Sequence, residues 1–227
     1  MEQLTGGFTL DIPQGAFPLS TDSMVLSGFV RLPKRARVLD LGSGCGTLGL
    51  LLCARQGDCR VTGVELDPGS HEGALDNIAR NGLQSRMESI CADLRTVSLP
   101  AGTFDVCVSN PPYFSGGPAS ALHCHARRED LCSLEDLMTA AAGALKYGGD
   151  FFLVHRPERL AELCSAGSRH ALEAKDLCLV RHRKDGPVTL VLLRLRKGGK
   201  PGLLWQEMYL REPDGSPSAA YQQLYHL

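Results

Sequence analysis

The stretch Ala36-Arg-Val-Leu-Asp-Leu-Gly-Ser-Gly-Cys-Gly46 decides the fold of this chain. Its first six residues are mostly apolar and predict a buried strand over residues 36–41. The three glycines that follow permit positive φ angles and let a ligand approach the backbone closely. An apolar segment from about Thr47 to Arg55 then predicts a helix. A strand, a glycine-rich turn and a helix in this order form the first unit of a nucleotide-binding α/β fold.

Strand and helix signals alternate through the rest of the chain, which indicates an α/β domain. A helix starts at Asp67-Pro68, with a cap and a proline in its first turn, and stops at Asn81-Gly82. A capping-box sequence starts another helix at Ser133, and Tyr147-Gly-Gly149 is expected to end it. Further strands are expected over residues 60–64, 87–91, 104–108, 150–155, 177–182 and 188–196, and a short helix over residues 157–166.

Acidic residues stand where nucleotide-binding folds place their ligand contacts. Glu65 ends the second strand, about where such folds carry the acid that binds both ribose hydroxyls. Asp93 follows the third strand, and its position fits either a ligand contact or a turn aspartate. Asp22 precedes a short apolar helix, Ser23–Val30, which either it or Ser20 can cap. The sequence therefore predicts a ligand site at the carboxyl ends of the first strands.

A second polar motif, Ser109-Asn-Pro-Pro-Tyr-Phe114, follows the apolar strand over residues 104–108. Its two consecutive prolines have no N–H groups and end the sheet ladder, and Pro111 keeps Asn110 in an extended conformation. The loop thus carries an amide, a bare carbonyl and an aromatic ring at the end of a strand, where open α/β sheets bind ligands. Both oxygens can accept hydrogen bonds from an NH2 group. The motif suits methylation of a planar amino nitrogen, although a proline-stiffened turn alone also explains it.

The composition is that of an ordinary globular chain, with room for one large α/β domain. Of the 227 residues, 43% are hydrophobic and 22% are charged, and the net charge of −1 neither supports nor excludes RNA as a partner. The nine cysteines contain no Cys-x-x-Cys pair, which predicts reduced thiols and a cytoplasmic location. No metal site is expected, because His123 and Cys124 lack a second ligand pair at zinc spacing. No secretory signal or membrane span is expected. Residues 175–200 form the one basic stretch, with eight Lys/Arg against two Asp/Glu, which could contact phosphates or form a solvated edge.

Several segments together resemble the bacterial tRNA(Val) adenine-N6 methyltransferase family, especially its branch in Gram-positive bacteria. This family belongs to the class I S-adenosylmethionine-dependent methyltransferases of the Asn-Pro-Pro-Tyr type. The likeness spans nearly the whole chain, and the later segments are more diagnostic of the branch than the glycine-rich turn. The segments that carry it are Phe17-Pro-Leu-Ser-Thr-Asp22, Val38 to Gly46, Glu65, Asn110 to Phe114, Cys132-Ser-Leu-Glu-Asp136, Val154-His-Arg-Pro-Glu-Arg-Leu160 and Lys197-Gly-Gly-Lys-Pro201.

The resemblance implies a Rossmann-like α/β fold with a seven-stranded, mostly parallel sheet in the order 3-2-1-4-5-7-6 and helices on both faces. It implies a single domain over residues 1–227, with a lead-in over 1–35, a catalytic core over 36–196 and a tail over 197–227 packed on the core. The implied activity is N6-methylation of an adenine in tRNA, next to the anticodon. The implied cofactor is S-adenosylmethionine, converted to S-adenosylhomocysteine, with no metal, no membrane association and no obligate protein partner.

The resemblance also assigns residues to three roles. The catalytic residues would be Asn110 and Pro111, whose oxygens accept the amine N–H groups, with Pro112 and Tyr113, whose ring stacks on the base. The cofactor would contact Asp22, Asp40, Gly42, Ser43, Gly44, Gly46, Glu65, Leu66, Asp93, Leu94 and Asn110. The substrate would contact Tyr113, Phe114, Arg127, Arg128 and Arg156. One departure is Arg128, which stands where relatives tend to carry histidine, so a different substrate stays open.

Three other functions remain compatible with these motifs. Asn-Pro-Pro-Tyr also serves enzymes that methylate a glutamine amide in release factors, although those carry a helical amino-terminal domain for which the residues before the first strand leave little room. A non-catalytic RNA-binding protein on the same scaffold would be expected to lose the glycines or Asn110, and both are present. A dehydrogenase would use Glu65 on the ribose of NAD but has no use for the Asn110 motif.

Overall fold

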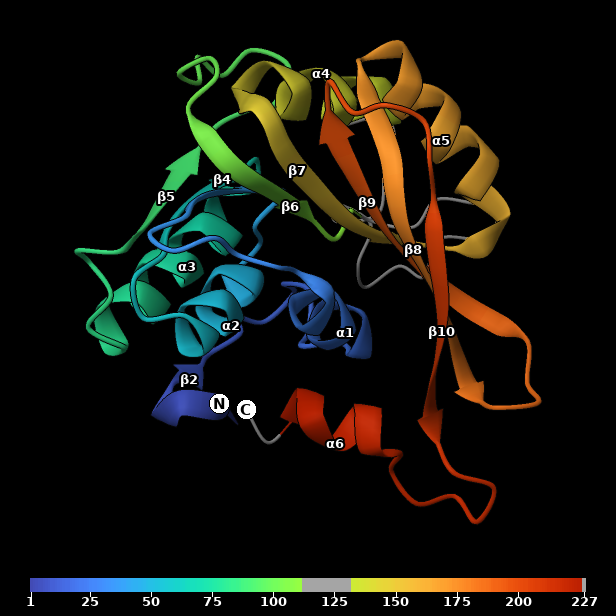
Figure 1. The fold of residues 1–227 in the computed structure, drawn as a ribbon. Coiled ribbons are helices and arrows are strands. Elements are labelled where there is room, and N and C mark those ends of the chain that lie inside the picture. The colour runs from blue at the N-terminus through green and yellow to red at the C-terminus, as the bar shows by residue number, and fades with distance from the viewer. Residues whose placement is uncertain (112–131, 226–227) are drawn as a thin grey trace.

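The computed structural model describes residues 1–111 and 132–225, and Figure 1 shows its ribbon. A central sheet runs through this part of the chain and gives the molecule its layers. Its strands are β3 (Arg37–Leu41), β4 (Arg60–Glu65), β5 (Met87–Cys91), β6 (Phe104–Ser109), β7 (Leu145–His155), β8 (Leu172–Arg183), β9 (Val188–Lys197) and β10 (Leu204–Arg211).

The sheet order across these described residues is β10-β8-β9-β7-β6-β3-β4-β5. Numbered along the chain from β3, seven of the strands follow the predicted order 3-2-1-4-5-7-6, which is therefore confirmed for them. The predicted count of seven is wrong by one, because β10 pairs in parallel with the outer side of β8. Among the described strands of this sheet, β9 alone runs antiparallel, to both of its neighbours β7 and β8. The β8–β9 connection and the carboxyl ends of the parallel strands therefore share one edge of the sheet.

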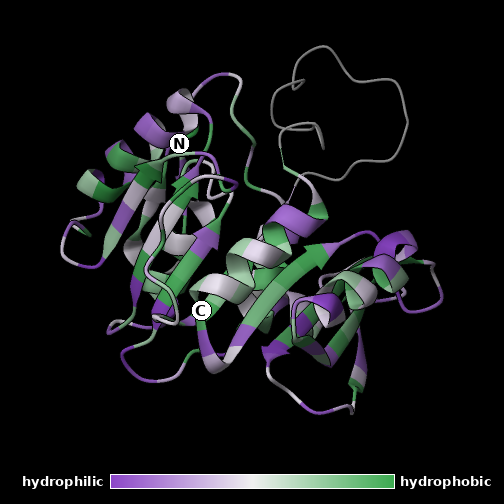
Figure 2. Cartoon of the chain, turned by 90° about the horizontal axis from the view of Figure 1, so that it is seen from above, coloured by the Kyte–Doolittle hydropathy of each residue, from purple (hydrophilic) through white to green (hydrophobic). Residues whose placement is uncertain are grey.

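Helices cover both faces of the sheet (Figure 1). One face packs against α1 (Thr21–Phe29), α2 (Thr47–Arg55), α3 (Pro68–Arg80) and α6 (Ala219–Tyr225), and the other against α4 (Leu134–Ala144) and α5 (Leu160–Arg169). Hydrophobic residues colour the strands between these layers green in Figure 2. Short elements lie outside this sandwich: β1 (Glu2–Gln3), η1 (Thr5–Gly7), β2 (Thr9–Leu10) and η2 (Pro157–Arg159).

Successive side chains of each strand point to opposite faces of the sheet, so the sheet contributes to a hydrophobic core on each face. Val106 and Val108 of β6 belong to the core beneath α1 and α2, whereas Cys107 belongs to the core beneath α4 and α5. Phe152 and Phe151 of β7 divide in the same way, because successive strand residues point to opposite faces. Strands buried on both faces are nearly continuous apolar runs, which is the pattern that predicts them.

Local capping signals place most helix starts where the sequence predicts them. Asp67 Oδ2 accepts a hydrogen bond from Ser70 N at 2.8 Å and begins α3. Ser133 and Asp136 form the expected capping box of α4. Ser20, rather than Asp22, caps α1, because its Oγ accepts from Ser23 N.

The predicted end of α4 is wrong. The helix stops at Ala144, and Tyr147-Gly148-Gly149 lie within β7. Leu145 pairs with Phe104, and the next paired position along β7 is Asp150 with Val106, so the residues between form an irregularity. Gly148, with a φ of 79°, permits this turn of the backbone inside the strand. No helix in the described part of the chain is long and apolar enough to span a membrane.

Candidate active site

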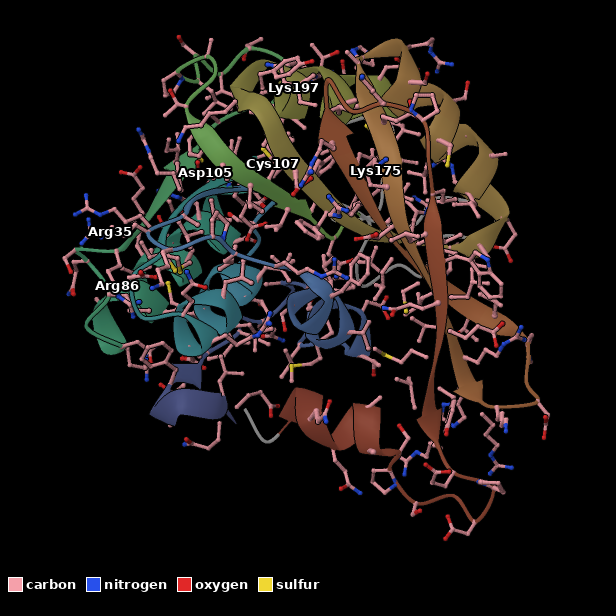
Figure 3. The ribbon with its side chains drawn as sticks, viewed as in Figure 1. Arg35, Arg86, Asp105, Cys107, Lys175 and Lys197 are labelled. Atoms are coloured by element: carbon pink, nitrogen blue, oxygen red, sulfur yellow. The ribbon has the colours of Figure 1, made fainter. Side chains whose placement is uncertain are left out.

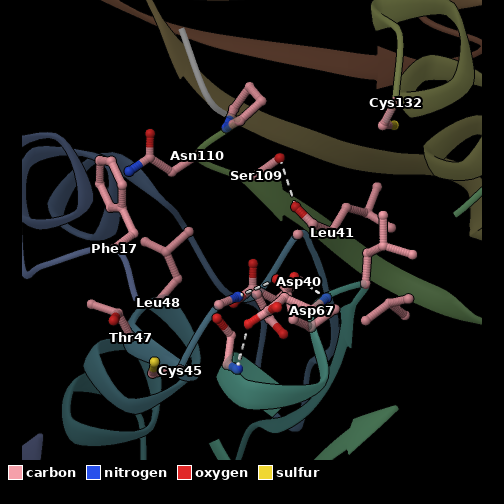
Figure 4. A pocket seen from close by; sticks show the side chains of 18 of the residues that line it. Phe17, Asp40, Leu41, Cys45, Thr47, Leu48, Asp67, Ser109, Asn110 and Cys132 are labelled. Atoms are coloured by element: carbon pink, nitrogen blue, oxygen red, sulfur yellow. Dashed lines mark hydrogen bonds between the residues drawn. The ribbon is translucent and has the colours of Figure 1, made fainter. Parts of the chain in front are cut away.

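A pocket of about 950 Å³ opens at the carboxyl ends of β3, β4, β6 and β7. Its size is in the range of cofactor and small-ligand sites. It joins two sets of residues that are far apart in sequence, one from the glycine-rich turn and one around Asn110 (Figure 4). Of the described residues assigned to the site from sequence, the lining includes Asp22, Asp40, Gly42, Ser43, Gly44, Glu65, Leu66, Asp93, Leu94, Asn110, Pro111 and Arg156.

The glycine-rich turn forms an open cradle. Gly42 and Gly44 have φ angles of 72° and 55°, and a Cβ atom added to either would meet no atom within 4 Å. Side chains at these positions would thus enter the pocket and be strained as well. Gly46, also assigned to the cofactor site from sequence, does not line the pocket and is the N-cap residue of α2. A Cβ there would lie 2.7 Å from Met87 Cε, which a flexible methionine could move away, so it is the φ of 81° that favours glycine at this position.

Asp40 is buried beneath this cradle with only 1% of its surface exposed. Neither of its carboxylate oxygens makes a hydrogen bond of good geometry, although the backbone N–H of Gly49 in α2 opposes part of the rise in its pKa. The buried Ser43 Oγ has no partner either. Burial, followed by repulsion from Glu65, raises the pKa of Asp40 to about 7. A buried carboxylate without partners is costly, and a cation at the pocket would relieve that cost.

Glu65 lies at the end of β4 with its carboxylate fixed by the backbone. Gly44 N donates to Oε2 at 2.7 Å, and Asp67 N donates to Oε1 at 2.8 Å. Each oxygen keeps a further lone pair for a ligand hydroxyl. The arrangement therefore suits a ribose contact.

Asp93 lies at the pocket but is already engaged. Arg95 donates to its two oxygens through its side chain and its backbone N–H, with the shortest contact at 2.5 Å. The hydrogen bonds from Arg95 also lower the pKa of Asp93. A turn aspartate explains these contacts, and a ligand amine would have to share the carboxylate with Arg95.

This half of the pocket fits S-adenosylmethionine. That molecule carries positive charge on its ammonium and sulfonium groups, and two hydroxyls on its ribose. The cradle at Gly42 and Gly44 offers space, Asp40 offers an unpaired buried carboxylate, and Glu65 offers fixed acceptors. Within the described residues, no three His, Cys, Asp or Glu side chains form a group that could hold a metal ion.

Asn110 stands directly after β6 on the opposite wall of the pocket, where Figure 4 shows it beside Phe17. Its Nδ2 donates to Ser23 Oγ of α1 at 3.0 Å. The preceding Ser109 is fully buried and donates from Oγ to Leu41 O at 2.7 Å, which ties the end of β6 to β3. These contacts position the amide and the Pro111 carbonyl at the pocket. The predicted site residues Pro112, Tyr113, Phe114, Arg127 and Arg128 lie outside the described residues.

The segment after β7 closes the far side of the pocket with His155, Arg156 and Arg159. Nδ1 of the buried His155 accepts a hydrogen bond from Arg156 N at 2.8 Å. Burial, then the charge of Arg159, lowers the pKa of His155 to about 4, so its ring is neutral at physiological pH. Arg159 forms a two-point contact with Glu162. The pocket therefore has an acidic half around Asp40 and Glu65 and a basic half around these arginines.

Sequence reasoning missed several lining residues. Ser23 follows Asp22 directly, but its contact with Asn110 joins positions 87 apart in the chain, and no local signal reveals it. His155 and Arg159 fall in the segment Val154–Leu160, and their place at the end of a predicted strand was the available signal. Phe17 likewise belongs to a segment noted only for its likeness to a family motif.

Residues 21–163 match the family model described as "Methyltransferase small domain". The chain is 32% identical to the tRNA1(Val) (adenine(37)-N6)-methyltransferase of Dickeya chrysanthemi (strain Ech1591), over 97% of this chain and 92% of that protein. The protein of the same name from Aeromonas hydrophila is also 32% identical, over 96% of this chain and 92% of its own length.

Solved structures share the fold. A predicted O-methyltransferase from Agrobacterium tumefaciens superposes with a TM-score of 0.75 at 23% identity, covering 90% of this chain and 95% of that one. Geranyl diphosphate C-methyltransferase from Streptomyces coelicolor A3(2), solved with S-adenosyl-L-homocysteine, gives a TM-score of 0.59 at 13% identity, over 77% and 79% of the two chains. These likenesses establish a class I methyltransferase fold.

Proposed function

This chain belongs to the methyltransferase small domain family and, within it, to the tRNA1(Val) (adenine(37)-N6)-methyltransferases, and from that premise we propose that it methylates N6 of an adenine in tRNA. The relatives are named for adenine 37 of tRNA1(Val), and we propose the same position, next to the anticodon, for this chain. The enzyme is an S-adenosylmethionine-dependent methyltransferase, and action on tRNA implies a cytoplasmic location. We also propose that residues 1–227 act as one domain, with the lead-in and the tail packed on the core.

The cofactor half of the pocket holds the methyl donor through groups of this chain. S-adenosylmethionine, when bound, supplies a methyl group on a positively charged sulfur. The buried Asp40 carboxylate favours the positive charge of the cofactor, and Glu65 accepts hydrogen bonds from the ribose hydroxyls. The turn at Gly42 and Gly44 leaves room for the cofactor to contact the protein backbone. Asp22, Ser43, Leu66 and Leu94 complete the wall.

The target half holds the amino group that is methylated. The Asn110 side-chain oxygen and the Pro111 carbonyl accept the two N–H groups of the adenine amine, which must first be turned out of its stack. The lone pair of that nitrogen is delocalised into the ring, so the amine is a poor nucleophile. Two fixed acceptors favour the positive charge that builds on the nitrogen in the transition state. Tyr113, which lies outside the described residues, is proposed to stack on the base.

The proton leaves the amine without a protein base. An amide oxygen such as that of Asn110 is too weak a base to take a proton, so this side chain acts through hydrogen bonding alone. After methyl transfer the nitrogen is cationic and strongly acidic, and its proton passes to water. His155, neutral and buried in the basic half, helps to shape the wall of this part of the pocket.

One observation carries the proposal: Asn110 and Pro111 open into the same pocket as the unpaired carboxylate of Asp40 and the glycine cradle. The test incubates the protein with labelled S-adenosylmethionine and an unmodified tRNA1(Val) transcript, followed by nucleoside mass spectrometry. We expect N6-methyladenosine in the tRNA. A release factor serves as the alternative substrate in a parallel reaction.

The other outcomes each support a different function. Methylglutamine in the release factor with no change in the tRNA would contradict the proposal and identify an amide methyltransferase. Absence of both products, with no binding of S-adenosylmethionine by calorimetry, would indicate a non-catalytic protein on this scaffold.

A further inference from the structure

The hairpin between β8 and β9 projects from the edge of the sheet that carries the pocket. β8 runs parallel to β7, so its last residue, Arg183, lies at the same edge as His155 at the end of β7. In Figure 1 the hairpin extends beyond the arrowhead of β8 at the lower right. His182, Arg183, Lys184 and Asp185 are all exposed there.

A direct contact joins this hairpin to the rim of the pocket. Arg156, which lines the pocket, donates from Nη1 to the carbonyl of Thr189 at 3.2 Å, and Thr189 is the second residue of β9. Thr189 Oγ1 in turn donates to Val180 O across the hairpin at 3.2 Å. Thr189 lies five positions after Lys184, so the tip can be at most about 18 Å from this contact. That reach corresponds to a few nucleotides of a bound RNA.

The cations at the tip differ from those at the other end of the same strands. Lys175 and Lys197, labelled in the upper half of Figure 3, donate to the carbonyls of Lys200 and Leu145. Arg194 and Arg196 are paired with Asp150. By contrast, within the described residues the side chains of Arg183 and Lys184 make no hydrogen bond or ion pair. Two exposed charges without partners remain available to an anion.

The arrangement of strands concentrates more positive charge beside the tip. Arg211 of β10 is the register partner of Arg183, although like charges on neighbouring strands repel. Arg181 is compensated by Glu207, and Asp185 lies in the turn itself. Arg159 at the pocket is likewise compensated by Glu162. The excess of positive charge at the tip lies on the same side as Arg156, away from Asp40 and Glu65.

We propose that the β8–β9 hairpin is an RNA-binding arm, in which Arg183 and Lys184 contact phosphates that flank the target nucleotide. This inference rests on the proposed function and names the surface by which the tRNA is held outside the pocket. Phosphate contacts by Lys and Arg give affinity and orientation without reading bases. They also release counterions, so each contact adds to the salt dependence of binding. The net charge of −1 means that binding must rely on such a local surface.

The experiment measures binding of an unmodified tRNA1(Val) transcript by fluorescence anisotropy between 50 and 300 mM KCl. We expect the double variant Arg183→Ala/Lys184→Ala to bind at least 10-fold more weakly at low salt. The slope of log K against log salt concentration should fall in magnitude by about 1.5 to 2. The matched control is Lys34→Ala/Arg60→Ala, which removes two exposed cations from the opposite edge of the sheet, beside β3 and β4. This control should leave both the affinity and the slope unchanged.

Two further measurements separate the possible results. Binding of S-adenosylmethionine by calorimetry should be equal in all the proteins, and Arg183→Lys/Lys184→Arg, which keeps the charges, should restore tRNA binding. If the wild type methylates the transcript but the hairpin double variant and its control bind it equally well, the hairpin inference is wrong and the proposed function stands. If the wild type neither binds nor methylates the transcript, both are wrong.

Discussion

Asn110 is held by residues that are distant from it in the sequence. Its amide donates to Ser23 of α1, and the strand end that carries it is tied to β3 through Ser109 and Leu41. The motif itself was predictable, because consecutive prolines after an apolar strand have few structural alternatives. Its partner Ser23 was not predictable, because the contact exists only once α1 packs on the sheet near the end of β6. The hydrogen bond from Arg95 to Asp93 was not predictable either, because the position of an aspartate at a strand end does not show which residue pairs with it.

Replacement of Asn110 tests the role of its oxygen. We expect Asn110→Ala to lower the turnover number by about 10²–10³, because one of two fixed acceptors of the amine is lost in the transition state. The affinity for S-adenosylmethionine should hardly change, as measured by calorimetry. Ser23→Ala keeps the amide and removes its hydroxyl partner, so its loss of turnover should be smaller. A fall in cofactor affinity as large as the fall in turnover would contradict this role for Asn110.

Asp40 should make the stability of the cofactor-free protein depend on pH. Its pKa rises from 3.8 to about 7 on folding, so between these values the folded state keeps a proton that the unfolded chain has released. The free energy of unfolding therefore falls as the pH rises from about 4 to about 7, and it stays lower above that. We expect Asp40→Asn to remove this dependence. At pH 8 the variant should be more stable than the wild type by on the order of 1–3 kcal/mol, measured by urea unfolding.

The same variant provides its own control at low pH. At pH 5 the wild-type carboxyl is already protonated in the folded state, so Asp40→Asn should gain less there than at pH 8. Calorimetry should show weaker binding of S-adenosylmethionine, because the charge that compensates the cofactor is gone. An equal stability change at both pH values would mean that the carboxyl titrates normally in the folded protein.

Among the secondary-structure elements, the first residues of helices were easier to predict than the last residues. Asp67 and Ser133 cap their helices through side chains that the sequence displays. The boundary between α4 and β7 was missed because Tyr147-Gly148-Gly149 resembles a helix stop. These residues instead form an irregularity where β7 begins beside β6. Pairing with a neighbouring strand is a tertiary effect, and it outweighed the local glycine signal.

The connection between α5 and β8 contains a residue that glycine should improve. Ala171 has a φ of 56° directly after the C-cap residue His170, in the left-handed region that disfavours side chains. We expect Ala171→Gly to raise the free energy of unfolding by about 0.5–1 kcal/mol, measured by urea denaturation. Ala161→Gly, at an exposed position in the first turn of α5, is the matched control and should lower it by about 0.5–1 kcal/mol. Destabilisation by both changes would show that this position tolerates alanine without strain.

In the molecule as a whole, the outermost strand of the sheet, β10, is the element that the sequence did not predict. β10 pairs with β8, yet the residues Leu204–Arg211 are largely exposed at their start and buried only near Leu210. A strand with so little apolar alternation gives a weak sequence signal. The order of the other strands was predictable through family resemblance, because a hydrophobic pattern alone does not fix which strands are neighbours. The segments that carry the resemblance end at Pro201, and the sheet order it implies has seven strands, so the place of β10 emerges only from the structure.

Two leucines of β10 test whether this strand belongs to the cooperative fold. Leu210 is 7% exposed and contacts the core beneath α1, whereas Leu204 is 74% exposed. We expect Leu210→Ala to lower the free energy of unfolding by about 2–4 kcal/mol through lost burial and a residual cavity. Leu204→Ala should change it by less than about 0.5 kcal/mol. Circular dichroism in urea should show one transition for both variants. A separate early transition in Leu210→Ala alone would mean that β10 unfolds independently of the sheet.

The unpaired carboxylate of Asp40 has a consequence for the lifetime of the enzyme in the cell. At neutral pH, which is close to the raised pKa of Asp40, about half of the molecules without cofactor bear an uncompensated buried charge, whereas a cationic ligand compensates it and adds its own binding free energy to the folded state. The empty form should therefore open more often and be cleaved first by proteases. Degradation would then remove idle copies selectively, and the surviving population would be enriched in enzyme that is ready to act.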